Sequence, residues 1–217
     1  AFSADVLERS DIVIVAPDYR KSQILPFPAG FIDCYDVLLW VRDHANQLNI
    51  DPNKIIEAGH SAGGGMTAAI TLKTRDTQDV KLAFQMPIYP MIDHRMTTAS
   101  SKMLGSTMWD AEINAQAWRR YLRDIKGAVP AYASPALNDN YSGFPPTISF
   151  VGDLEPFHDE NVAYIEALKN ADVPVKFKIF KGAYHGFEIG SAETTMGKAG
   201  NQFQLDAFEE FYDKYVQ

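Results

Sequence analysis

The sequence predicts an α/β fold, a mostly parallel sheet with helices on both faces and a small helical lid between two of the strands. Short apolar segments rich in β-branched residues alternate along the chain with longer segments whose apolar residues recur at helical spacing. At residues 54–72 an apolar segment passes through a Gly/Ser turn directly into a helix-like segment. Such alternation favours an open parallel sheet whose strands are joined by crossover helices.

Composition and charge predict one domain and exclude several classes of function. A chain of 217 residues with 46% hydrophobic content can bury about 70% of its unfolded surface, so residues 1–217 are expected to form a single domain. The net charge of −8 comes with no block of basic residues, which argues against nucleic acid as a partner. No run of 18 apolar residues is present, so no membrane span is expected.

The single cysteine, Cys34, lies in an apolar helical pattern and cannot form an internal disulfide. This fits a reducing compartment, and we expect a cytoplasmic protein. The chain begins at Ala1 rather than at a methionine, so a secreted protein whose signal has been removed stays the alternative.

The first sixty residues predict a helix, a strand, a second helix and a second strand. Ala1–Arg9 has the apolar spacing of the end of a helix, and Asp11–Ala16 has the continuous apolar pattern of a buried central strand. After a proline-rich loop, residues 31–48 repeat apolar side chains at helical spacing, and the next strand ends at Gly59.

The second half of the chain predicts three more strands and a lid. A strand at residues 82–86 should end before Pro87, which cannot donate to a ladder. Residues 91–145 contain no strand pattern and are expected to form the lid. The remaining expected elements are a lid helix at 110–122, strands at 146–151 and 175–180, a helix at 160–171 and a closing helix at 205–216. Two lysines on one face of the strand at 175–180 place it near the sheet edge.

The turn between the second strand and its helix carries a G-x-S-x-G motif, Gly59 to Gly63. A serine on such a strand-to-helix turn is held in a strained conformation and exposed as a nucleophile. Gly59 and Gly63 are expected to be glycines because strand and helix approach closely there. The motif therefore predicts Ser61 as the nucleophile and the amide of Ala62 as an oxyanion donor.

Serine at its free pKa is a weak nucleophile and needs a base. His185 follows the last predicted strand, between two glycines, in the chain order Ser, acid, His that goes with this motif. A surface-loop histidine is the alternative interpretation. The other histidines are His44, His60, His94 and His158.

The acid that orients the base should lie in the loop at the end of the preceding strand. The loop at 151–160 offers Asp153, Glu155, Asp159 and Glu160. The last two suit the first turn of the following helix. The residues alone leave the choice of acid open.

Several motifs together resemble the hormone-sensitive-lipase-like branch of the α/β-hydrolase superfamily, which contains carboxylesterases and lipases. They are the G-x-S-x-G turn, D-Y-R at 18–20 with F-P-A at 27–29, the acidic loop with V-P-V at 173–175, and Y-H-G-F at 184–187. The resemblance runs from Asp11 to Phe187. It implies hydrolysis of small esters through Ser61, His185 and Glu155, the carboxylate that precedes proline. It implies no metal or organic cofactor.

The chain departs from that branch in ways that affect the expected activity. Glu155 stands where the branch usually has Asp, and His60 stands where it often has Asp. The His-Gly-Gly-Gly loop that completes the branch's oxyanion hole has no counterpart upstream of Asp11. The resemblance implies that this loop and further strands precede Ala1, so that the domain is N-terminally incomplete. The 217 residues alone are then expected to self-associate as homo-oligomers. A truncated and weakened hydrolase is the alternative.

Soft, flexible side chains gather in the expected lid. The candidates for binding the acyl group of a substrate are Met91, Met96, Met103, Met108 and Trp109. Packing of the lid against the sheet is the alternative role. Two further functions stay open: amide, formamide or lactone hydrolysis by the same triad, and ligand binding without catalysis. The resemblance includes plant hormone receptors that keep the serine and lack the histidine, and His185 argues against that role.

Overall fold

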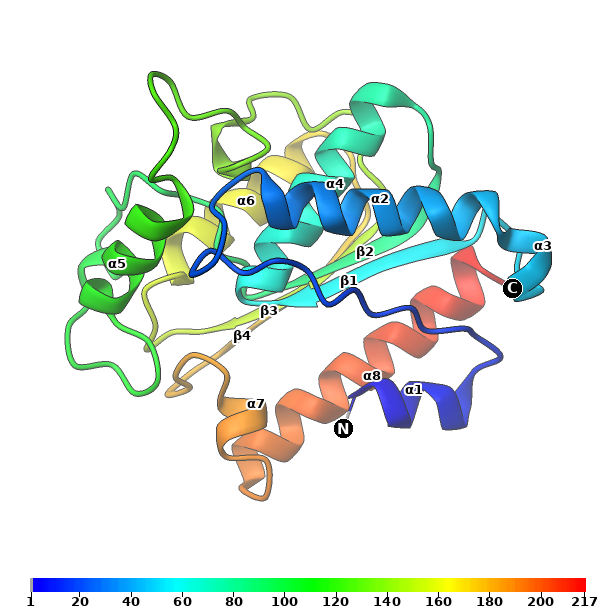
Figure 1. Cartoon of the computed structure of the whole chain (residues 1–217). Helices are drawn as coiled ribbons and strands as arrows, with labels where there is room; N and C mark the ends of the chain where they lie inside the picture. Colours follow the sequence, from blue (N-terminus) through cyan, green and yellow to red (C-terminus); the bar gives the residue numbers. More distant parts are fainter. Residues whose placement is uncertain (1) are drawn as a thin grey trace.

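The computed structural model describes residues 2–217 and has at its centre a parallel sheet of four strands in sequence order (Figure 1). The strands are β1 (Ile55–His60), β2 (Leu82–Ile88), β3 (Thr147–Gly152) and β4 (Val175–Phe180). Every residue of β2 and β3 is buried, whereas β4 at the edge is partly exposed. The expected parallel α/β fold is confirmed, as is the edge position of the lysine-bearing strand.

Helices cover both faces of the sheet (Figure 1). One face carries α2 (Ala29–Asp43), α4 (Ala62–Thr77) and α6 (His158–Asn170), and the other carries α1 (Phe2–Arg9), α7 (Phe187–Gly190) and α8 (Thr195–Tyr215). The short helix α3 (Ala45–Leu48) follows α2. None of the helices in residues 2–217 combines the length and apolar character needed to cross a bilayer.

Two helices depart from their expected bounds by more than two residues. Helix α8 begins at Thr195, ten residues before the expected start, because the side chain of Thr194 caps it by accepting from the Gly197 amide at 3.0 Å. The expected helix at 31–48 is divided in two at His44. The expected contribution of Ala1 to the first helix lies outside the described residues.

Strand β2 continues through Pro87 to Ile88, so the expected end at Met86 is wrong. Proline removes one ladder donor and keeps its carbonyl, which accepts a hydrogen bond from the Ser149 hydroxyl at 2.6 Å. Donors on either side of it still reach β3 and the loop before it: the Gln85 amide bonds Pro146 at 2.9 Å and the Tyr89 amide bonds Phe150 at 3.0 Å.

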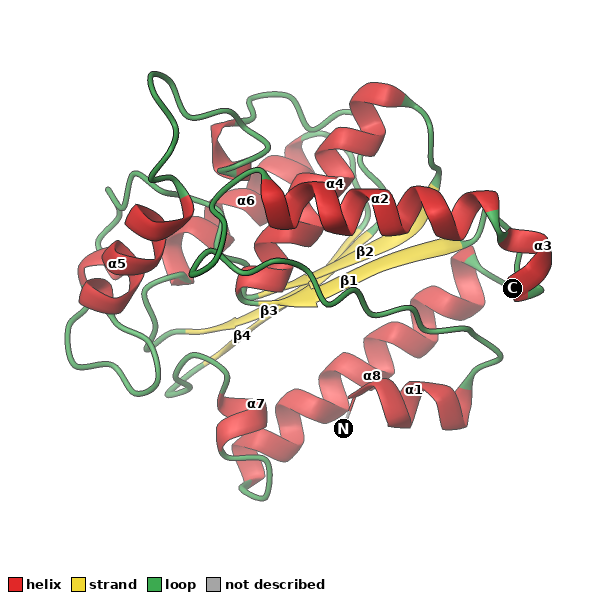
Figure 2. Cartoon of the chain, viewed as in Figure 1, coloured by secondary structure: helices red, strands yellow, loops and turns green. Residues whose placement is uncertain are grey.

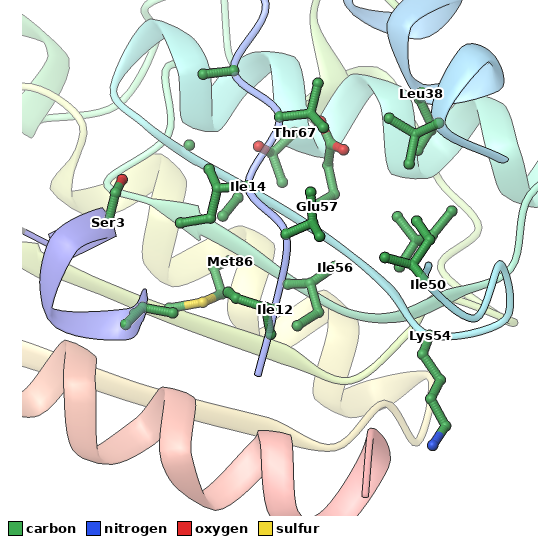
Figure 3. A pocket seen from close by; sticks show the side chains of 18 of the residues that line it. Ser3, Ile12, Ile14, Leu38, Ile50, Lys54, Ile56, Glu57, Thr67 and Met86 are labelled. Carbon is green, nitrogen blue, oxygen red and sulfur yellow. The ribbon is translucent and has the colours of Figure 1, made fainter. Parts of the chain in front are cut away.

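The prediction of a strand at Asp11–Ala16 is also wrong, because this extended segment pairs with no strand within the described residues. A space of about 680 Å³ separates it from β1 (Figure 3). Ile12 and Ile14 line one side of this space, and Ile56 and Glu57 line the β1 side. Since β1 ends the sheet on this side, neither the segment nor the strand has a ladder partner there among residues 2–217. We call this space the slot.

The segment between β2 and β3, which the sequence predicts to be a lid, is mostly loop, and Figure 2 shows its connections around α5 (Ala111–Tyr121). Asp110 caps this helix by accepting from the amides of Glu112 and Ile113, each at 3.0 Å. The lid also contains the short turns Ser100–Lys102 and Pro135–Leu137. The lid therefore has one principal helix, as its sequence pattern predicts.

Candidate active site

Ser61 lies on the turn between β1 and α4, with φ 56° and ψ −115°. Such a backbone is strained for a residue with a side chain and persists only where its surroundings hold it. The end of β2 does so on both sides of the serine. The Ser61 amide donates to the Ile88 carbonyl at 3.0 Å, and the Ser61 carbonyl accepts from the Met91 amide at 3.1 Å. The turn is thus held by two hydrogen bonds to the backbone at and just after the end of β2.

Close backbone contacts explain two of the glycines around the serine. A Cβ on Gly59 would lie 2.4 Å from the Gly63 carbonyl oxygen, and one on Gly65 would lie 2.2 Å from the Met91 carbonyl oxygen. A Cβ on Gly63 would meet nothing within 4 Å. The expectation that Gly63 avoids a collision is therefore wrong, because Gly63 lines the slot and no packed backbone lies against it.

His185 lies between the serine and one carboxylate. Its Nε2 is 2.8 Å from Ser61 Oγ, and its Nδ1 is 2.6 Å from Glu155 Oε2. Glu155 is fully buried, and His185 is 7% exposed. The second carboxylate oxygen of Glu155 accepts from the Gly152 amide at 3.2 Å. This chain of contacts matches a Ser-His-acid triad in which the hydroxyl faces the base and the acid orients it.

The other carboxylates of the acidic loop bind elsewhere. Asp153 accepts from the Gly182 amide at 2.6 Å, and Asp159 accepts from the Ser100 amide at 2.8 Å. Glu160 accepts from the amides of Ile92 and Asp93, and burial raises its pKa well above the usual range. These carboxylates tie the sheet ends and the lid together, which leaves Glu155 facing the histidine.

The remaining histidines also have partners away from Ser61. His44 bonds the Trp40 carbonyl, His94 the Ser134 hydroxyl, and His158 the Asp159 carboxylate. His60 lies beside Ser61 in sequence but contacts the Gln204 side chain on α8, and burial lowers its pKa.

Aromatic rings surround the imidazole of His185. Phe157 meets it edge to face with ring centroids 5.1 Å apart, and Trp109 lies 6.1 Å away. Tyr89 packs against it at 4.8 Å. The imidazole is thus packed among aromatic rings and is largely buried.

The amide of Ala62 is available as an oxyanion donor. It belongs to the first turn of α4, whose amides have no carbonyl partner inside the helix. The positive end of the helix dipole lies at the same place. Donors of this kind stabilise the negative oxygen of a tetrahedral intermediate.

A cavity of about 240 Å³ opens beside Ala62. Met91 and Trp109 line it, whereas Met96, Met103 and Met108 are not among its lining residues. Sequence analysis missed several aromatic residues of this cavity, namely Tyr19, Trp118, Tyr121 and Tyr132. Trp118 and Tyr121 lie on the apolar side of the predicted lid helix, and that position was the only indication in the sequence that they face a cavity. Within residues 2–217, no cluster of three or more His, Cys, Asp or Glu side chains is placed to hold a metal ion.

A family model described as alpha/beta hydrolase fold matches residues 1–189. The chain belongs to this α/β-hydrolase family. The match confirms the resemblance drawn from the sequence motifs. Among curated relatives, an arylesterase of Saccharolobus solfataricus is 29% identical over 198 residues, which are 90% of this chain and 64% of that protein. A carboxylesterase of Mycobacterium tuberculosis is 32% identical over 183 residues, which are 81% of this chain and 56% of that protein.

Solved α/β-hydrolase structures have the same arrangement. The structure of a bacterial heroin esterase matches with a TM-score of 0.84 and 33% identity, covering 89% of this chain and 62% of that one. The esterase LipW of Mycobacterium marinum matches with a TM-score of 0.83 and 29% identity, covering 90% of this chain and 62% of that one. The chain thus spans less than two thirds of the length of these relatives.

Proposed function

We propose that this chain is the catalytic part of a serine hydrolase that cleaves small carboxylic esters through an acyl-enzyme. The observation that carries the proposal is the continuous line of contacts from Ser61 Oγ through both nitrogens of His185 to Glu155 Oε2, at 2.8 and 2.6 Å. The named relatives support the reaction class, since they are an arylesterase and a carboxylesterase.

In the first half of the reaction, Ser61 Oγ attacks the ester carbonyl carbon while His185 Nε2 takes the hydroxyl proton. The carbonyl oxygen becomes negative and accepts a hydrogen bond from the Ala62 amide. The tetrahedral intermediate then collapses, the bond to the alcohol oxygen breaks, and His185 gives its proton to the departing alcohol. Glu155 stays ionised and holds the imidazolium in place.

In the second half, a water molecule attacks the acyl-serine carbonyl and His185 Nε2 takes its proton. The second tetrahedral intermediate releases the carboxylic acid, and Ser61 recovers its proton from the imidazolium. Each residue returns to its starting state, so the cycle consumes one ester and one water and forms one alcohol and one acid.

The cavity beside Ala62 supports small, partly aromatic or short-chain esters as substrates. Its volume of about 240 Å³ lies below the roughly 300–1,000 Å³ of drug-sized ligand sites. Met91 adds a flexible wall, and Trp109 both lines the cavity and packs against the ring of His185. The cavity is lined mainly by apolar and aromatic side chains, which favours uncharged acyl groups.

We further propose that residues outside these 217 complete the oxyanion hole and fill the slot beside β1. A strand in the slot would pair with β1 on one side and with residues 11–16 on the other. The support is the 680 Å³ slot between them and the greater length of the relatives. A second amide donor is worth about 100- to 1,000-fold in rate, so the chain alone should be a weak enzyme.

Turnover of p-nitrophenyl acetate and butyrate tests the proposal, with Ser61→Ala as the matched variant. We expect the substitution to abolish turnover and to leave the melting temperature nearly unchanged, because it removes one hydroxyl. Unchanged turnover in a folded Ser61→Ala protein would refute the proposed function. A panel that adds an anilide and a lactone separates ester hydrolysis from the alternatives that use the same triad. If the 217 residues alone are monomeric and turn over these esters at about 10 per second, no oxyanion donor from outside the chain is needed, and that part of the proposal is wrong.

A further inference from the structure

A second buried carboxylate lies close to His185, three residues further along the chain. Glu188 is 2% exposed and belongs to the short helix α7. One of its oxygens, Oε1, accepts a hydrogen bond from the hydroxyl of Tyr89. Its other oxygen, Oε2, is buried and has no hydrogen-bond partner within the described part of the chain. The triad chemistry described above gives this carboxylate no role.

Tyr89 connects Glu188 to the catalytic histidine. Its ring meets the imidazole of His185 at a centroid distance of 4.8 Å and an interplanar angle of 71°, an edge-to-face contact. The same ring also packs against Phe150, at 5.4 Å. The tyrosine is 1% exposed, so it is enclosed between the sheet and the helices of one face.

The backbone of Tyr89 is itself constrained. Its φ is 33°, which lies in the left-handed region that a residue with a side chain rarely adopts. Its amide donates to the Phe150 carbonyl, and the preceding carbonyl, that of Ile88, accepts from the Ser61 amide. The segment that clamps the nucleophile therefore also presents the tyrosine ring to the base. Strain of this kind tends to be retained at functional sites.

We propose that Tyr89 and Glu188 are positioning residues for His185. The tyrosine ring supports the imidazole between Ser61 and Glu155, and Glu188 holds the tyrosine and, when ionised, places a second negative charge near the base. This inference rests on the proposed esterase function and deepens it, because it assigns the neighbours that keep the general base in place.

Electrostatics supports a coupling between Glu188 and the histidine. The pKa of Glu188 is raised, chiefly by burial and also by the charge of Glu155, while the hydrogen bond from Tyr89 and a positive charge on His185 oppose the rise. Such coupling is reciprocal, so an ionised Glu188 favours the imidazolium that forms during catalysis. The titratable groups that face the imidazole from the elements around it are Glu155, Glu188, Tyr89 and the nearby ring of His60.

Glu188→Gln is the decisive variant, since its amide oxygen can still accept from Tyr89 while the charge is removed. Tyr89→Phe keeps the ring and removes the hydroxyl. Tyr184→Phe is the matched control, because it removes a tyrosine hydroxyl bonded to Ser191 on the far end of α7. All are made in the full chain and compared by melting temperature, kcat, KM and the pH dependence of the His185 ring signals in nitrogen NMR, assigned with His185→Asn.

For Glu188→Gln we expect the midpoint of the ring titration to move to lower pH by about one unit. We also expect kcat to fall about tenfold, with KM within about twofold. Tyr89→Phe should lower kcat less, and the double variant should lose less than the sum of the two single losses because both act through one contact. Tyr184→Phe should leave the titration and kcat unchanged.

A Glu188→Gln protein with wild-type titration and wild-type kcat, whatever its melting temperature, would overturn the proposal and leave Glu188 as a structural residue. The ring titration needs no turnover, so it decides the Glu188 coupling even where the chain alone is a weak enzyme. Failure of the esterase function is seen separately, as turnover that survives in Ser61→Ala.

Discussion

Replacing Glu155 with Gln tests the choice of acid most sharply, because the two side chains have the same length. Glu155 is fully buried, and its two oxygens have different partners. One accepts from Nδ1 of His185 at 2.6 Å, and the other accepts from the Gly152 amide at 3.2 Å. A glutamine must turn its NH₂ group toward one of these two donors. Both orientations therefore lose a hydrogen bond that the carboxylate makes.

The cost follows from the tautomer of His185. If the glutamine NH₂ faces Nδ1, that nitrogen must accept, and the ring proton moves to Nε2, which then cannot take the proton of Ser61. In another Ser-His-Asp enzyme, replacing the acid by its amide lowers kcat by about 10⁴ through this wrong tautomer. We expect a loss of about 10³ to 10⁴ here, which is about 4 to 5.5 kcal/mol of barrier.

The assay is kcat for p-nitrophenyl acetate, with Asp153→Asn as the matched control. Asp153 lies in the same loop, but its carboxylate accepts from the Gly182 amide at 2.6 Å instead of from the histidine. Asparagine keeps an oxygen for that bond, so kcat should change little. If folded Asp153→Asn lost more activity than folded Glu155→Gln, the acid would be Asp153 and the assignment of Glu155 would be wrong.

Three other predictions follow from the geometry. Gly59→Ala should lower the free energy of unfolding by about 2 kcal/mol or more, because its Cβ would lie 2.4 Å from the Gly63 carbonyl oxygen; equal stability of Gly59→Ala and Gly63→Ala in urea would contradict this. Burial raises the pKa of Glu57 from 4.5 to about 7, so the folded state keeps a proton that the unfolded state loses, and stability should fall as pH rises between these values. Glu57→Gln should reduce that slope in urea titrations at pH 5 and 8, leaving the part due to other buried carboxyls such as Glu160, and a slope equal to that of the wild type would refute the assignment. Met91→Ala should enlarge the cavity beside Ala62 and favour longer acyl chains, whereas Met103→Ala should not; the opposite ranking across acetate, butyrate and hexanoate esters would show that the cavity is not the acyl site.

Local chemistry allowed Ser61 and His185 to be predicted from the sequence. A strand that ends in G-x-S-x-G and continues as a helix specifies one backbone turn, and the chain order of serine, acid and base places the histidine after the last strand. Glu155 needed the resemblance, because Asp153 in the same loop had an equal chemical claim, and suitability for a helix N-terminus did not exclude Asp159 and Glu160. Only the folded structure distinguishes these three carboxylates from Glu155, because it shows that each of them accepts from a backbone amide instead of facing His185.

Other features depend on partners far away in the sequence. The apolar pattern of residues 11–16 indicates an extended segment, but a ladder needs a neighbouring strand, and the slot lies where that neighbour would be. Glu188 had no visible signal because its role depends on Tyr89, 99 residues earlier in the chain. The continuation of β2 past Pro87 likewise depends on a hydroxyl supplied by Ser149.

Covalent labelling of the nucleophile tests the central claim most directly. The protein that carries this chain is treated with a fluorophosphonate, which reacts with activated serines, and its peptides are analysed by mass spectrometry. The account predicts one adduct, on Ser61, and no adduct in a folded His185→Asn protein, because the base that activates Ser61 has been removed. An adduct on another serine, or equal labelling of Ser61 with and without His185, would contradict it.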